Sequence, residues 1–298
     1  MPPSLSRKGA ARPAPNVHQQ AVLNTVSGGS RIVVINAFAG TGKTATLELV
    51  ARQMKASDNR RVHYLVFNQK NAQEARRRMP DNTTVTTAHG LAWRAPHPDT
   101  GEPMQRFFFG VCSSAYPRIR DWLADRNQRD VTAINATMTR FCHSAGRSIE
   151  REHLPPPILT RSRTEEIDAC LRLARDAFEH LRGAGGVPVS HAVYLKLCSL
   201  SPPVLPVDVV MIDEAQDLNP CMLEIVEKQI QSGKQIILVG DTYQHIHDFT
   251  GAVDAMQYIA RKYRPEIQGS QSAAPGGQLS FWRRNCRCGQ PSPAPDGL

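Results

Sequence analysis

The stretch Ala37-Phe38-Ala39-Gly40-Thr41-Gly42-Lys43-Thr44 decides how this chain folds. It follows a β-branched run, Arg31–Asn36, and opens a stretch of helical pattern that begins near Lys43. This order of strand, loop and helix predicts a phosphate-binding loop, because backbone N–H groups and a helix N-terminus can surround phosphate oxygens. The stretch matches the pattern G-x-x-x-x-G-K-T except that Ala37 occupies the first glycine position.

Each part of this loop has an expected role in binding ATP and its cation. The backbone of Ala37–Thr44 is expected to bind the phosphates, Lys43 to reach the β- and γ-phosphates, and the Thr44 hydroxyl to bind Mg²⁺. A chance glycine turn is the alternative interpretation. The sequence Gly-Lys-Thr, placed between a strand and a helix, argues against it.

An acidic motif ends another apolar strand much later in the chain. Val207–Ile212 is strongly apolar and is followed directly by Asp213 and Glu214. Asp213 is expected to hold Mg²⁺, and Glu214 to orient and deprotonate the attacking water. The alternative interpretation is that these acids only mark a helix N-terminus, where negative charge suits the helix dipole. That alternative does not explain two adjacent acids after an apolar strand in a chain that also has a phosphate loop.

Strand and helix patterns alternate around these two motifs. Strands are expected over Arg31–Asn36, Val62–Phe67, Thr83–Thr87, Val207–Ile212 and Gln235–Val239. Helices are expected over Lys43–Lys55, Gln69–Met79, from near His89, and over Leu218–Gln231 and Ala252–Lys262. This alternation predicts an α/β fold with a mostly parallel sheet covered on both faces.

Residues 93–206 interrupt the alternation, and loops in such folds are usually about 2–6 residues long. Helical periodicity over Thr164–Arg182 predicts an inserted, mainly helical subdomain. The stretch Arg264–Gln278 is rich in Ser, Gly, Gln and Pro and indicates a linker. The expected organisation is a flexible basic tail at 1–15, an ATP-binding lobe at 16–92 and 207–263, the insert at 93–206, and a linker-like tail at 264–298.

Composition narrows the class of partner and compartment. The chain has 36 Lys and Arg against 27 Asp and Glu, a net charge of +9, which favours a polyanionic partner. Its seven cysteines are scattered and odd in number, so they indicate an intracellular, reducing compartment, whether nucleus or cytoplasm, rather than a disulfide framework. No apolar run approaches the roughly 20 residues of a membrane-spanning helix, so no membrane partner is expected.

Several further motifs give the chain a resemblance to a known family. Asp213–Asp217 reads Asp-Glu-Ala-Gln-Asp, Val239–Ile246 reads Val-Gly-Asp-Thr-Tyr-Gln-His-Ile, and Phe249–Ala252 reads Phe-Thr-Gly-Ala. Together they resemble the UvrD/Rep branch of superfamily 1 DNA helicases. Ser190–Leu197 and Gly251–Ala255 narrow the resemblance to the F-box DNA helicase group.

The resemblance implies a RecA-like P-loop NTPase lobe and adds site residues. Gln19 matches a glutamine that reads adenine, Gln244 a residue that senses the γ-phosphate, and Arg287 an arginine that approaches it. The residues that match contacts to single-stranded DNA are Phe67, Asn68, Lys70, Thr87, His89 and Phe249. The implied function is the ATP-binding lobe of an ATP-dependent 3′-to-5′ DNA helicase, with ATP and Mg²⁺ as cofactors and single-stranded DNA as partner.

The chain also departs from the family pattern. Thr250 stands where the family has arginine, His247 where it has tyrosine, and Cys286 where an aromatic residue stacks on adenine. We expect no F-box segment before Asn16 and no second RecA-like lobe, so unwinding is expected only if a longer product or a partner chain supplies that lobe. Two alternatives stay open: a non-motor remnant or truncated gene product that binds ATP and DNA, and a different P-loop ATPase.

Overall fold

The structure is a computed structural model that describes residues 14–37, 42–124, 128–241, 255–263 and 266–269. At its centre is a six-stranded sheet in the order β3-β2-β6-β7-β1-β8, and every pairing in it is parallel. The strands are β1 (Ile32–Asn36), β2 (Val62–Val66), β3 (Thr83–Thr87), β6 (Val209–Ile212), β7 (Gln235–Gly240) and β8 (Glu266–Gly269). The prediction of a parallel α/β sheet of the RecA-like P-loop class is confirmed.

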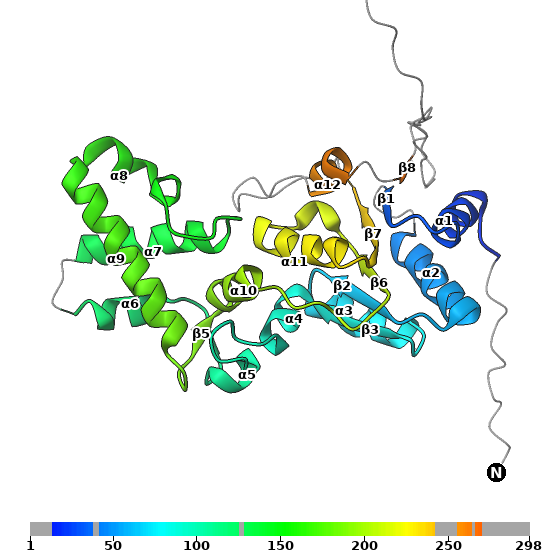
Figure 1. Ribbon diagram of the computed structural model, residues 1–298, viewed down its shortest axis with the longest axis horizontal. Coiled ribbons are helices and arrows are strands. Elements are labelled where there is room, and N and C mark those ends of the chain that lie inside the picture. The colour runs from blue at the N-terminus through cyan, green and yellow to red at the C-terminus, as the bar shows by residue number, and fades with distance from the viewer. Residues whose placement is uncertain (1–13, 38–41, 125–127, 242–254, 264–265, 270–298) are drawn as a thin grey trace, which may run out of the picture.

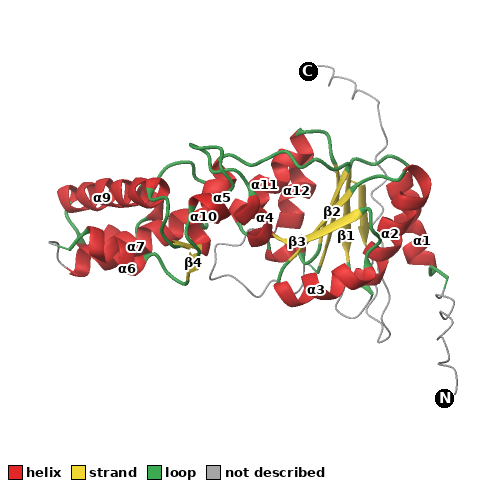
Figure 2. Ribbon diagram, turned by 90° about the horizontal axis from the view of Figure 1, so that it is seen from below, coloured by secondary structure: helices red, strands yellow, loops and turns green. Residues whose placement is uncertain are grey.

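Helices cover both faces of this sheet, which explains why its strands are apolar on both sides (Figure 2). Along β1, Val33 and Ile35 belong to one buried cluster, whereas Ile32 and Val34 belong to the other. The first cluster is completed by α1 (Val17–Ser27), α2 (Lys43–Asp58) and α3 (Gln69–Arg78). The second is completed by α4 (Ala88–Arg94), α10 (His191–Leu200), α11 (Pro220–Gln231) and α12 (Ala255–Tyr263).

Some element boundaries differ from the expected ones for local reasons. The helix expected from Leu218 begins at Pro220, because the Asn219 side chain accepts a hydrogen bond from the Met222 N–H and caps it. The residues before it form a short 3₁₀ helix, η2 (Ala215–Asp217). Within the stretch expected to be a linker, Glu266–Gly269 forms β8 and pairs with β1, so the linker prediction is wrong for those four residues.

The interrupting stretch is mostly helical and extends to one side of the sheet (Figure 1). Its hydrophobic side chains join the cluster on the α11 face. No described helix is both long and apolar enough to cross a membrane. The boundaries of the insert at 93 and 206 stay a prediction. The elements are α5 (Met104–Phe107), β4 (Val111–Cys112), α6 (Tyr116–Trp122), α7 (Gln128–Cys142), η1 (Arg151–His153), α8 (Pro156–Arg161), α9 (Thr164–Gly183) and β5 (Val189–Ser190).

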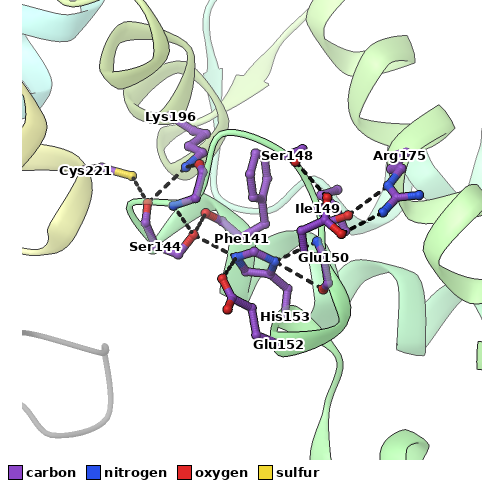
Figure 3. Close-up of polar contacts among 11 residues, drawn as sticks. Phe141, Ser144, Ser148, Ile149, Glu150, Glu152, His153, Arg175, Lys196 and Cys221 are labelled. Carbon is purple, nitrogen blue, oxygen red and sulfur yellow. Dashed lines mark hydrogen bonds and ion pairs between the residues drawn. The ribbon is translucent and has the colours of Figure 1, made fainter.

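A buried lysine and a cysteine hold the residues that follow α7 (Figure 3). Lys196, on α10, is 1% exposed, and its ammonium lies 4.1 Å from the centroid of the Phe141 ring. It donates hydrogen bonds to the backbone oxygens of Ser144, at 2.9 Å, and Gly146. The thiol of Cys221, on α11, donates to the Ser144 oxygen as well. The end of α7 is therefore held by both α10 and α11.

Replacing Lys196 with methionine is expected to destabilise the chain, because methionine fills the space but cannot donate to the two carbonyl groups. The Ser144 oxygen keeps the Cys221 thiol as a donor, whereas the Gly146 oxygen loses the Lys196 ammonium. An acceptor left without its donor costs about 1–3 kcal/mol, so the free energy of unfolding should fall by about that amount. Denaturant unfolding measures it. The control is Lys55→Met, whose side chain is 44% exposed in an ion pair with Asp81. Equal unfolding midpoints for the two variants would contradict the prediction.

Candidate nucleotide-binding site

The two motifs singled out in the sequence meet at the carboxyl edge of the sheet. Lys43 opens α2, after the loop that leaves β1, and Glu214 follows β6, with β7 lying between the two strands. The Lys43 Nζ lies 2.6 Å from the Glu214 Oε2. The side chain of Lys43 is 10% exposed and that of Glu214 30%. The structure thus brings the expected phosphate-binding lysine and the expected general base into an ion pair.

The ends of the phosphate loop have the backbone that such a loop requires. The Ala37 N–H donates to the Gly240 oxygen at 2.8 Å, which extends the pairing of β1 with β7. Gly42 has φ +83° directly before α2, in the left-handed region that favours glycine. The N-terminus of α2 therefore opens at the site, where its free N–H groups favour an anion. The remaining loop residues of the prediction, Phe38, Ala39, Gly40 and Thr41, lie outside the described residues.

Glu214 has an unusual backbone conformation. Its φ of +50° and ψ of +46° lie in the left-handed region, which is costly for a residue with a Cβ. Its N–H donates to the Asp213 Oδ1 at 3.0 Å, and its Oε2 accepts a hydrogen bond from the Gln216 Nε2 at 2.9 Å. Strained backbone of this kind persists where surrounding contacts hold it, and it clusters at functional sites.

Asp213 and Thr44 offer the oxygen ligands that Mg²⁺ prefers. Asp213 is 9% exposed, and its Oδ2 accepts a hydrogen bond from the Tyr64 hydroxyl at 2.7 Å. Burial raises the pKa of Asp213, and the Tyr64 hydrogen bond opposes that rise. A buried carboxylate beside a hydroxyl and a lysine fits a cation that keeps several waters and takes phosphate oxygens as further ligands.

Sequence reasoning missed two residues that hold the acidic motif against β7. The Gln216 Oε1 accepts a hydrogen bond from the Asp241 N–H at 3.0 Å, while the Nε2 of the same side chain reaches Glu214. A Cβ on Gly240 would lie 2.6 Å from the Met256 Sδ and closer still to the Gln216 Oε1. A residue with a Cβ there would therefore require both side chains to move. In the sequence, the signal that could have indicated this contact is the glycine at the end of an apolar strand, Gly240.

The structure places Gln19 beside the phosphate-loop helix. Its Nε2 lies 3.5 Å from the Thr46 Oγ1, and its Oε1 accepts a hydrogen bond from the Asn16 N–H in a capping box. The neighbouring Gln20 is exposed and bonds to Asn24 on the same helix. Adenine recognition by Gln19 stays a prediction. Gln244 and Arg287, the other residues expected at the γ-phosphate, lie outside the described residues.

Two of the expected DNA contacts lie at the same edge of the sheet. Phe67 follows β2 and His89 follows β3, its parallel neighbour. Phe67 is 47% exposed and lines an apolar pocket together with Glu214 and Met222. The His89 Nδ1 is buried without a hydrogen-bond partner among the described residues, and its ring lies 5.2 Å from that of His191. The pocket therefore opens beside the nucleotide site.

Of the other expected DNA contacts, two cap helices and one is exposed. The Asn68 side chain caps α3 by accepting from the Asn71 N–H at 2.8 Å, and the Thr87 hydroxyl caps α4 by accepting from the Gly90 N–H at 3.0 Å. Lys70 is exposed on the first turn of α3. The roles of Asn68, Thr87 and Lys70 in DNA binding stay predictions. Phe249 lies outside the described residues.

Comparison with known proteins places this geometry in a family. The family described as "AAA domain" matches residues 18–250. F-box DNA helicase 1 of Gallus gallus is 29% identical over 282 residues, which cover 84% of this chain and 26% of that protein. F-box DNA helicase protein 1 of Schizosaccharomyces pombe is 28% identical over 247 residues, which cover 74% of this chain and 26% of that protein.

The chain spans about a quarter of the length of these curated relatives. Among solved structures, VirB4 of Thermoanaerobacter pseudethanolicus aligns with a TM-score of 0.34 and 13% identity, over 80% of this chain and 76% of that chain. The fold assignment itself rests on the parallel sheet and on the strand, loop and helix that carry Lys43.

Proposed function

The chain belongs to the AAA domain family and is a superfamily 1 helicase-like protein, and on that premise we propose that it is the ATP-binding lobe of an ATP-dependent DNA helicase. The observation that carries this proposal is the 2.6 Å contact between Lys43 and Glu214. It joins a phosphate-binding lysine to a general base across two motifs. Unwinding, with 3′-to-5′ polarity, belongs to an assembly in which a second RecA-like lobe closes the site.

The described residues divide the chemistry among them. Bound Mg²⁺ would neutralise charge that develops on the phosphates. Asp213 and the Thr44 hydroxyl would hold that cation. When Lys43 turns to the phosphates, Glu214 loses its cationic partner and becomes free to accept a proton from water. Gln216 bridges the Glu214 carboxylate and the Asp241 N–H, and so links the acidic motif to the motif Val239–Ile246.

Single-stranded DNA is the proposed partner. The pocket lined by Phe67 lies beside Glu214, so a strand bound there would touch the residues next to the catalytic carboxylate. Aromatic faces accept any base, since stacking needs no particular hydrogen-bond pattern. The net charge of +9 favours contacts with a phosphate backbone.

Phe67→Ala is expected to weaken binding of single-stranded DNA by about 1–3 kcal/mol, the value of one stacked base. The affinity of the parent chain should also fall steeply as salt rises, because phosphate contacts release counterions. Fluorescence anisotropy with labelled oligonucleotides at several salt concentrations measures both effects. The control is Val204→Ala, which alters an apolar side chain that is 50% exposed in the segment before β6.

The same preparations separate the helicase lobe from its two rivals when phosphate release is followed with and without single-stranded DNA. Stimulation by DNA supports the proposed function. ATP turnover at the same rate with and without single-stranded DNA favours a different P-loop ATPase. Binding of both ligands without turnover favours the non-motor remnant.

A further inference from the structure

A tyrosine inside the sheet contacts one candidate ligand of the magnesium ion, Asp213, and lies near the other, Thr44. Tyr64 is the middle residue of β2 and is 0% exposed. Its hydroxyl donates to the Asp213 Oδ2 at 2.7 Å. Burial raises the pKa of Tyr64, and the Thr44 side chain nearby opposes that rise. No motif of the sequence analysis includes this residue, and the function proposed above gives it no role.

The position of Tyr64 follows from the pairing of two strands. β2 lies directly beside β6, with Tyr64 opposite Met211, two residues before Asp213. The side chain therefore reaches along the sheet to the strand end where Asp213 stands. Its ring packs in the cluster that includes Val62 and Val66, which is a place that phenylalanine would fill equally well.

The hydroxyl group is what sets this residue apart from an ordinary core aromatic. A buried hydroxyl needs a partner, and this one has the Asp213 carboxylate, on the catalytic edge. The two Asp213 oxygens each accept one hydrogen bond, Oδ1 from the Glu214 N–H and Oδ2 from Tyr64. Each carboxylate oxygen has about two acceptor sites, so one stays available on each for the cation or its water.

Thr44 gains from the same hydroxyl. A threonine that binds a cation through its oxygen must direct its proton elsewhere, and the Tyr64 oxygen is an acceptor for that proton. Such outer hydrogen bonds fix the orientation of metal ligands. The Tyr64 hydroxyl bonds Asp213 in the acidic motif and lies near Thr44 on the phosphate-loop helix.

We propose that Tyr64 is a positioning residue of the magnesium site, whose hydroxyl orients the Asp213 carboxylate and the Thr44 hydroxyl toward the cation. This inference rests on the proposed function, since it requires that the chain bind Mg²⁺ with a nucleotide. It predicts an effect that depends on the metal rather than on the nucleotide alone.

The test compares the full-length parent with Tyr64→Phe, which keeps the ring and removes only the hydroxyl. Affinity for a non-hydrolysable ATP analogue is measured by calorimetry in Mg²⁺ and again in EDTA, and Mn²⁺ binding in the presence of the analogue is followed by electron paramagnetic resonance. Removing an outer partner of a metal ligand typically lowers metal affinity by about 10–100-fold. We expect Tyr64→Phe to lose Mn²⁺ affinity by that factor. The increase in affinity for the analogue that Mg²⁺ gives should shrink by the same factor, and the affinity for the analogue in EDTA should be unchanged.

Tyr194→Phe is the matched control, because Tyr194 is 2% exposed and its hydroxyl bonds a side chain at 2.7 Å, the Nδ1 of His191, in another part of the fold. This control should behave as the parent does. Parent-like metal binding by Tyr64→Phe would overturn the inference alone, and so would an equal loss of affinity in Mg²⁺ and EDTA. A parent chain that binds no nucleotide in either condition would overturn the proposed function and the inference together.

Discussion

Glu214→Gln is expected to slow ATP turnover by about 10²–10⁴-fold, the range that a positioned general base contributes. The glutamine is nearly isosteric but cannot accept a proton from water. The Gln216 amide and the Asp213 carboxyl group that flank Glu214 are unchanged in the variant. The folded site should therefore persist while the chemical step fails.

The same variant should bind ATP at least as tightly as the parent. In the structure the Lys43 ammonium is held by the Glu214 carboxylate, and this ion pair must open before Lys43 can reach a phosphate. Glutamine is neutral, so it competes less for the ammonium. Tighter binding together with slower turnover is a combination that general damage to the site would not produce.

Phosphate release and calorimetry measure the two quantities on one preparation. Glu224→Gln is the control for the charge change, since it removes a carboxylate from α11, the helix that follows the acidic motif. That control should keep the turnover of the parent. Turnover by Glu214→Gln at the rate of the parent would exclude Glu214 as the base.

The fold and the centre of the site follow from local sequence because the signals are local. A phosphate loop needs a strand, a glycine turn and a lysine within one short stretch, and all three adjoin Lys43. Asp213 and Glu214 follow their own strand directly. Parallel strands that alternate with helices place their carboxyl ends at one edge, so the meeting of Lys43 with Glu214 follows from the fold class.

The residues that hold the site in place did not follow from sequence, because their partners are distant in the chain. Tyr64 sits in an apolar run and looks like core until β2 is known to lie beside β6. Gln216 acquires its role from Asp241, which is 25 positions away. The pairing of β8 with β1 was missed for the same reason, since the composition around Glu266–Gly269 suggested only a linker.

Lys43→Ala is expected to lower the affinity for ATP with Mg²⁺ by about 10²–10⁴-fold. A hydrogen bond to a charged group is worth about 1.5–3 kcal/mol, and Lys43 is expected to make two, to the β- and γ-phosphates. Together they amount to about 3–6 kcal/mol, and each 1.4 kcal/mol corresponds to a tenfold change in affinity. Alanine is a good helix former, so α2 should keep its first turn.

The fold should survive this change, because the Glu214 carboxylate that loses its cation is 30% exposed and still accepts a hydrogen bond from Gln216. Calorimetry with ATP and Mg²⁺ gives the affinity, and circular dichroism confirms folding. The control is Lys55→Ala, which removes an exposed lysine from the last turn of the same helix and leaves the phosphate loop intact. A folded Lys43→Ala protein that binds ATP as tightly as Lys55→Ala would show that the loop at Ala37–Thr44 does not hold the phosphates.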